Sequence, residues 1–191
     1  MTPPMLSWVG LVLLVLLVTS GISDVRLGKI HNALTYPALA VAFIGHAMVG
    51  GLSGDGDKWM GLTGALVGFA VGFGPLLLAW LAGGIGGGDA KIAGAIGALA
   101  GWEFALDTLF FGLAAAAVMA MGIMLRRKIF RQTMKRILRF IFLALTPTRP
   151  ADPATPDSPK LPFGLALCVG AAVAVVIAVS QRSVSGFLFG M

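Results

Sequence analysis

Long apolar stretches with few charged residues constrain this chain more than any other feature of its sequence. These stretches cover about 5–22, 36–52, 59–82, 90–101, 104–125 and 162–180, and short polar breaks separate them. Only 12% of the residues are charged, whereas a soluble domain has roughly 25%. Because a chain of 191 residues has too little interior to bury so much apolar surface, lipid has to be its main solvent.

The fold class that follows is an all-α polytopic membrane protein with about six transmembrane helices, since each crossing takes about 20 residues. Six crossings leave room for loops but not for a second sizeable globular domain. We therefore predict that residues 1–191 form a single transmembrane domain. The chain has 27 glycines, and they recur every four residues at Gly64, Gly68 and Gly72 in the third stretch and at Gly97 and Gly101 in the fourth. This spacing favours helices that pack closely against one another in the membrane.

The basic residues divide unequally between the two sides of the predicted membrane. Twelve of the 14 lysines and arginines lie in the segments after the first, third and fifth apolar stretches. Only Lys58 and Arg182 lie in the other set of segments. Since lysine and arginine are enriched on the cytoplasmic side, we predict that the three basic segments face the cytoplasm and that both termini face outward.

Residues 126–145 are predicted to form a basic helix on the membrane surface. Arg127, Arg131, Lys135 and Arg139 recur every four residues, and apolar residues occupy another face. Such a helix lies in the interface of an anionic inner leaflet, so we expect membrane lipids rather than nucleic acid to be its partner. In residues 146–160 prolines recur every third position, which predicts an extended linker.

Two aspartates are the candidates for chemistry. Asp24 lies where the first apolar stretch ends, and Asp89 lies where the fourth begins. The chain crosses the membrane twice between them, so both are expected on the cytoplasmic side. An acid at the edge of the hydrocarbon is costly and marks a functional site. Two neighbouring carboxyl groups share a proton, and such a pair can activate water and polarise a carbonyl, as amide hydrolysis requires.

No other set of residues in the sequence competes with this pair. His31 and His46 are expected on opposite sides of the membrane, and the single cysteine, Cys168, cannot form an internal disulfide. The glycines before Asp89 do not form a phosphate-binding loop, because Ala90 precedes Lys91 and an isoleucine follows it. We therefore expect neither a metal nor another cofactor.

Three motifs of the chain resemble those of the type IV prepilin peptidases, which are polytopic aspartic proteases. The motifs are, in chain order, 23–26 (SDVR) followed by Ile30, Asn32, 34–35 (LT) and Pro37; 86–91 (GGGDAK), the family's G-x-G-D-x-K; and 161–164 (LPFG). The resemblance implies that Asp24 and Asp89 are the catalytic pair. It also implies that the substrate is a pilin precursor, which is cut after a glycine that ends a short basic leader.

Five further residues are expected to support the site or bind substrate: Arg26, Asn32, Gly86, Gly88 and Lys91. Arg26 either anchors the first helix by its charge or holds Asp24. Asn32 is expected to cap the second helix or to turn the chain into it. The glycines let a peptide backbone approach without obstruction by a Cβ atom. Three roles are open for Lys91: it lowers the pKa of Asp89 through proximity, it helps to bind substrate, or it marks the cytoplasmic interface of the membrane.

Longer members of the family carry an inserted cytoplasmic segment with paired C-x-x-C motifs, which is associated with methylation of the new amino terminus. This sequence has neither the insertion nor the cysteines. It resembles the short, peptidase-only branch that serves tight-adherence (Flp) pili, so methyltransferase activity is not expected. The resemblance implies a location in the bacterial cytoplasmic membrane, with the active site facing the cytoplasm.

A different class of function stays open at this stage. A small ion- or proton-coupled transporter, or a non-catalytic component of pilus or secretion assembly, could use the two inward acids to bind cations or protons. In transporters such acids tend to lie near the middle of the membrane, whereas both aspartates here are expected at its edge. The sequence leaves open which pilin is cleaved, the oligomeric state and the need for a partner protein.

Overall fold

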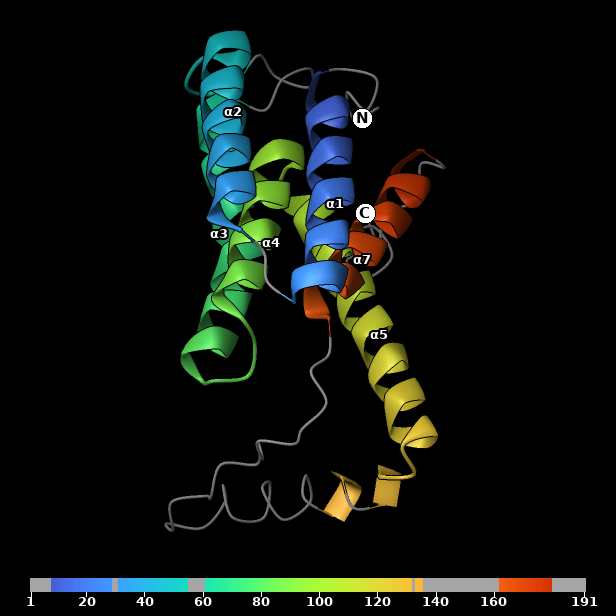
Figure 1. Ribbon diagram of the computed structural model, residues 1–191. Helices are drawn as coiled ribbons and strands as arrows, with labels where there is room; N and C mark the ends of the chain where they lie inside the picture. Colours follow the sequence, from blue (N-terminus) through green and yellow to red (C-terminus); the bar gives the residue numbers. More distant parts are fainter. Residues whose placement is uncertain (1–7, 29–30, 55–60, 132, 136–161, 180–191) are drawn as a thin grey trace, which may run out of the picture. The chain divides into compact units, whose positions relative to one another are not determined.

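A computed structural model describes residues 8–28, 31–54, 61–131, 133–135 and 162–179, and all regular structure within these ranges is helical. The helices, drawn in Figure 1, are α1 (Trp8–Leu27), α2 (Asn32–Gly50), α3 (Gly61–Leu81), α4 (Gly87–Ala100), α5 (Trp102–Arg126) and α7 (Phe163–Val179). Each of the six predicted stretches corresponds to one of these helices. The prediction of an all-α polytopic membrane protein is therefore confirmed.

The helix ends differ from the predicted ends by a few residues, for a physical reason. α1 runs on to Leu27, about five residues past the predicted end, and α2 begins at Asn32, four residues before the predicted start. Hydropathy indicates which residues lie in the hydrocarbon of the membrane. Backbone hydrogen bonds, however, can extend a helix beyond the hydrocarbon into the interface with water. The amide of Gly28, for example, still donates to the carbonyl of Asp24 at 2.9 Å. Asp24 is consequently part of the last turn of α1 rather than of a loop.

Four of the described helices are long and apolar enough to cross a membrane, namely α1, α2, α3 and α5. α4 has 14 residues and α7 has 17, so at 1.5 Å per residue α4 is only about 21 Å long. Nearly every residue of α4 from Asp89 to Leu99 is buried, and α4 packs against α1, α2, α3 and α7. Because other helices surround it, α4 can be shorter than the hydrocarbon is thick.

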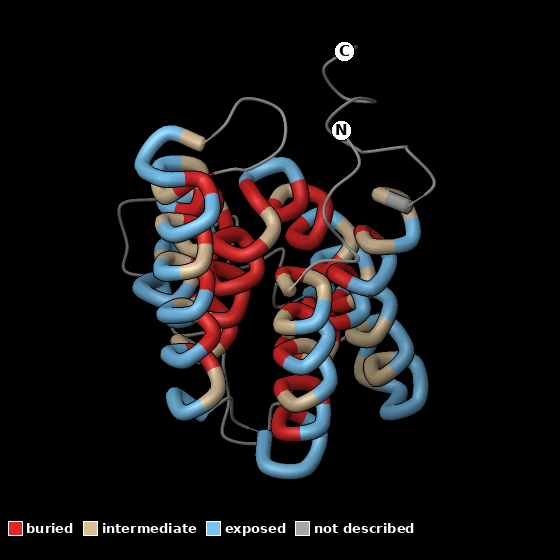
Figure 2. Tube along the Cα trace, turned by 90° about the horizontal axis from the view of Figure 1, so that it is seen from above, coloured by how far each residue is buried: buried red, intermediate tan, exposed pale blue. Residues whose placement is uncertain are grey.

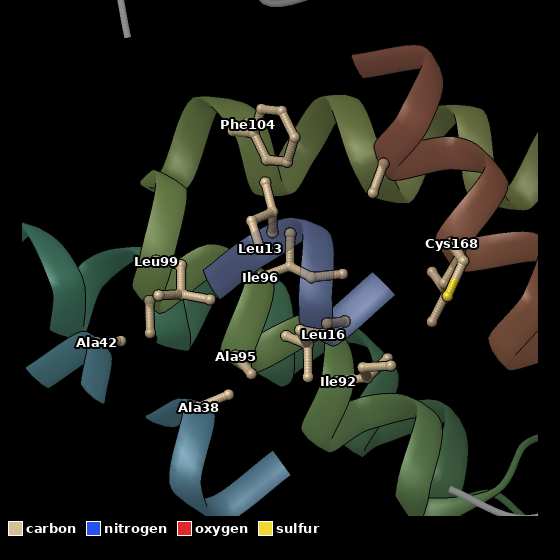
Figure 3. Packing of buried hydrophobic residues seen from close by; sticks show 14 of the residues in the cluster. Leu13, Leu16, Ala38, Ala42, Ile92, Ala95, Ile96, Leu99, Phe104 and Cys168 are labelled. Carbon is tan, nitrogen blue, oxygen red and sulfur yellow. The ribbon is translucent and has the colours of Figure 1, made fainter. Parts of the chain in front are cut away.

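Apart from α4, which is buried along most of its length, the described helices bury one side and expose the other, as Figure 2 shows along the Cα trace. The core is built around α4. Leu13 and Leu16 of α1 and Ala38 and Ala42 of α2 lie beside the residues of α4 (Figure 3). The exposed sides are also rich in large apolar residues, which is expected where lipid rather than water covers the surface.

Glycines allow α3 and α4 to form the most extensive helix pair in the structure. A Cβ atom added at Gly68 would overlap the backbone carbonyl of Gly97, and one added at Gly72 would overlap that of Ala93. α5 and α7 cross in the same way, through Gly112 and Gly170. The close packing predicted from the glycine spacing in the third and fourth stretches is thus confirmed at Gly68, Gly72 and Gly97.

The chain divides into two units, residues 1–115 with 162–191 and residues 116–161. In the second unit α5 ends at Arg126, and a turn follows in which Lys128 has a φ of 56°. Helical residues resume at 130–131 and 133–135. The basic helix expected over 126–145 therefore begins later than predicted, because the turn separates it from α5. Its remainder, and the linker predicted over 146–160, lie outside the described residues.

Candidate active site

Asp24 lies in the last turn of α1, and only 6% of its surface is exposed. Its Oδ2 accepts a hydrogen bond from the backbone amide of Leu165 at 2.8 Å. Leu165 belongs to the first turn of α7, where backbone amides have no acceptor within their own helix. The buried carboxylate is thus satisfied by a helix that lies far away in the sequence.

Asp89 lies in the first turn of α4 and is 9% exposed. The helix begins there because Gly86 takes an extended conformation, with φ −77° and ψ 141°. The amide of Asp89 donates to the carbonyl of Gly86 at 3.1 Å. Its carboxyl group lies beside Gly86, since an added Cβ at Gly86 would be 3.1 Å from Oδ2. A side chain at position 86 would therefore press on this carboxyl group.

The two aspartates come together, although 64 residues lie between them in the sequence. The charge of Asp24 acts on Asp89, and the charges of both act on the buried thiol of Cys168 in α7. Asp24 lies near the end of α1 and Asp89 near the start of α4, and these two ends are on the same side of the helices in Figure 1. Two buried acids thus converge where α1, α4 and α7 meet.

Lys91 is held by α2. Its Nζ donates to Oδ1 of Asn32 at 2.8 Å and to the hydroxyl of Tyr36 at 3.2 Å. The ammonium group also lies 5.1 Å from the centre of the Tyr36 ring, within the range of a cation–π interaction. We refer to Asn32, Tyr36 and Lys91 as the lysine clamp. It joins the start of α2 to the helix that carries Asp89.

Of the two expectations for Asn32, the structure agrees with the turn into α2 and not with the cap. His31 is the residue before α2, with φ −79° and ψ 136°, and Asn32 is the first helical residue. The Asn32 side chain serves Lys91 instead. Nδ1 of His31 and Oγ of Ser23 are 3.2 Å apart, so the residue before α2 also contacts the neighbour of Asp24.

The remaining predicted site residues differ in how far they are exposed. Arg26 is exposed in the last turn of α1. Gly86 is exposed, and Gly88 is half-buried between it and Asp89. The loop before α4 also contains Gly83, which has a φ of +78°, a backbone conformation that glycine adopts readily. The loop before α4 therefore places no side chain at positions 86 and 88, next to Asp89.

Sequence reasoning missed Tyr36 and the amide of Leu165. Tyr36 is the single tyrosine of the chain and lies four residues after Asn32, so the two share one face of α2. That spacing could have indicated a common partner for them. The sequence indicates the role of the Leu165 amide more weakly, because only the proline at position 162 marks the start of a helix there.

The sequence model of the type IV leader peptidase family matches residues 11–121, which include Asp24, Asp89 and the lysine clamp. Comparisons with curated proteins and with solved structures find no significant match. The family match covers more than half of the chain, so this protein belongs to the type IV leader peptidase family.

Proposed function

We propose that the protein is an aspartic endopeptidase that removes the short basic leader peptide from type IV or Flp-type prepilins. The observation that carries this proposal is the convergence of two buried acids, Asp24 and Asp89, from different helices. Burial and mutual repulsion disfavour the doubly charged state of such a pair, so one group holds a proton while the other is ionised.

The chemistry follows from this division of charge. The ionised carboxylate takes a proton from water, and the protonated group polarises the carbonyl of the scissile peptide bond. The half-buried and exposed glycines before Asp89 support close access for an extended substrate. Among the described residues no three His, Cys, Asp or Glu side chains form a metal-binding group, and the expectation of a reaction without a metal stays a prediction.

The proposed location is the bacterial cytoplasmic membrane, with both termini outside and the acids at the cytoplasmic face. The distribution of Lys and Arg supports this orientation. The partners are then the prepilin and the lipids of an anionic inner leaflet. The absence of C-x-x-C motifs from the sequence supports a peptidase without methyltransferase activity.

The direct test is cleavage of a defined precursor by the purified full-length protein in proteoliposomes. The precursor carries a short basic leader that ends in glycine, followed by an apolar helix. We expect one cut after that glycine, and a product whose mass shows no added methyl group. Cation or proton flux without cleavage would instead favour the transporter alternative, and cleavage at many sites would contradict the proposed specificity.

Labelling from one side of the membrane is expected to show that α2 begins, and α3 ends, in the cytoplasm. Ala33 and Ala82 are exposed at those ends, whereas Ser53 is exposed after α2. In a Cys168→Ala background, Ala33→Cys and Ala82→Cys should react with an impermeant thiol reagent only in inside-out vesicles. Ser53→Cys should react only in right-side-out vesicles, and the reverse pattern would overturn the orientation.

Removing the charge of the lysine clamp is expected to reduce cleavage moderately. Lys91→Met keeps the aliphatic stem but loses both hydrogen bonds to α2. Tyr36 is 54% exposed, and exposed charge interactions contribute about 0.2–1 kcal/mol, so we expect kcat to fall about two- to fivefold. Tyr36→Phe keeps the ring and should have a smaller effect. Wild-type kinetics for Lys91→Met would mean that the clamp does not position Asp89.

A further inference from the structure

Ser20 in α1 carries a hydroxyl group that the helix backbone does not satisfy. The residue is 0% exposed, and among the described residues its Oγ has no hydrogen-bond partner. Serine and threonine inside a helix commonly donate to the carbonyl four residues earlier. The adjacent Thr19 does so, since its Oγ1 donates to the carbonyl of Val15 at 2.6 Å. A buried hydroxyl group without any partner is costly, so the Ser20 side chain indicates a partner that is not part of the backbone.

This hydroxyl group lies one helical turn from the carboxyl group of Asp24. Both residues are buried, and residues four apart on a helix share one face, with Cβ atoms about 5–6 Å apart. Side chains of a helix tilt toward its N-terminus, so the Asp24 carboxyl group leans toward the turn that contains Ser20. The next buried residue on this face, Leu16, is apolar. The hydroxyl group therefore lies at the border between the acid pair and the apolar part of the core.

The spacing of the two groups suits one water molecule. Because Oγ of Ser20 has no partner among the described residues, it does not bond directly to the Asp24 carboxyl group. Hydrogen bonds between two oxygen atoms are about 2.7–2.8 Å long, so one bridging water joins oxygens up to roughly 5.5 Å apart. A buried water needs at least two polar partners. A hydroxyl group both donates and accepts, so it can hold the water whether Asp24 is ionised or protonated.

We propose that Ser20 is a positioning residue that holds the Asp24 carboxyl group through one bound water molecule. Oδ2 of Asp24 accepts the amide proton of Leu165 from α7, and the water adds a second contact from α1 itself. Two contacts from different helices fix the rotation of the carboxyl group, and proton transfer requires such alignment. The inference rests on the proposed peptidase function and adds to its site a residue outside the three motifs of the resemblance.

The first test measures whether the two side chains act together, and it needs no substrate. Ser20→Ala removes the hydroxyl group, and Asp24→Leu replaces the carboxyl group with an apolar group of similar shape. The fraction of folded full-length protein is measured against increasing SDS for the wild type, both single variants and the double variant. We expect Ser20→Ala to lower stability in the wild-type background. In the Asp24→Leu background it should raise stability, because the hydroxyl group has lost its partner there.

Thr108 provides the matched control. It is 1% exposed, and its Oγ1 likewise has no hydrogen-bond partner among the described residues, but it lies in α5, which follows the far end of α4 from Asp89. Thr108→Val should change stability equally with and without Asp24→Leu.

The second test measures precursor cleavage. Ser20→Ala should lower kcat about three- to tenfold, the usual contribution of one hydrogen bond. KM should stay unchanged, because the hydroxyl group does not touch the substrate. Thr108→Val should keep the wild-type kcat and KM.

Equal effects of Ser20→Ala on stability with and without Asp24→Leu would overturn the inference. Wild-type kinetics for Ser20→Ala, or a rise in KM alone, would also overturn it. Failure of the proposed function gives a different result, since the wild-type protein would then not cleave the precursor, whereas the coupling between Ser20 and Asp24 in the stability measurement would remain.

Discussion

Asp24→Asn and Asp89→Asn are each expected to lower the cleavage rate by at least about 10²- to 10⁴-fold, the usual contribution of a positioned acid or base. The asparagine side chain keeps the shape of aspartate, and its amide oxygen can still accept the Leu165 bond at position 24. It cannot take the proton of water or share one with its partner. Single-turnover cleavage in proteoliposomes, with matched amounts of folded protein, measures the loss.

Asp107 provides a matched control for this experiment. It is 3% exposed and lies in α5, which follows the far end of α4 from Asp89. Asp107→Asn makes the same chemical change at a buried aspartate outside the proposed pair, so the folded variant should cleave at near the wild-type rate. Cleavage within tenfold of the wild type by either Asp24→Asn or Asp89→Asn would exclude that residue from the reaction.

Gly68→Ala is expected to destabilise the protein strongly, because the added methyl group has no space. Its Cβ would overlap the Gly97 carbonyl, and backbone atoms on both helices would have to move. Overpacking a tight contact typically costs about 1–3 kcal/mol, and here the contact joins the two helices that position Asp89. We expect a lower melting temperature in detergent and less protein in the membrane.

Gly122→Ala is the control for the same substitution inside another helix, α5. A Cβ added at Gly122 would meet no atom of another part of the chain within 4 Å, and alanine is favoured over glycine inside a helix by about 0.5–1 kcal/mol. Its melting temperature should therefore equal or slightly exceed that of the wild type. Similar losses of stability for the two variants would mean that α3 and α4 do not pack through Gly68.

Three kinds of feature could be predicted from the sequence, because each depends on the order of residues along the chain. The apolar stretches indicated each helix to within a few residues, since lipid requires about 20 apolar residues for a crossing. The two crossings between Asp24 and Asp89 predicted that both lie on the same side of the membrane, one at the end of the first helix and the other at the start of the fourth. The glycine spacing also indicated close packing, and the structure bears this out at Gly68 and Gly97.

The contacts between helices could not be predicted in the same way. α1 and α2 are apolar around most of their surfaces, so periodicity does not indicate which side faces the core. Asn32 illustrates the difficulty: it stands at a helix start, where asparagine commonly caps, yet its side chain accepts the Lys91 bond. That choice depends on how α2 is rotated relative to α4.

The sequence by itself determined that this protein is helical and lies in a membrane, with one acid near the end of its first helix and another near the start of its fourth. These features follow from hydropathy, charge and spacing, which are properties of the chain. Only the tertiary structure decided that α7 donates to Asp24 and that α2 holds Lys91. The physical reason is that a hydrogen bond depends on positions within a few tenths of an ångström. Those positions are set when the small residues of neighbouring helices pack together.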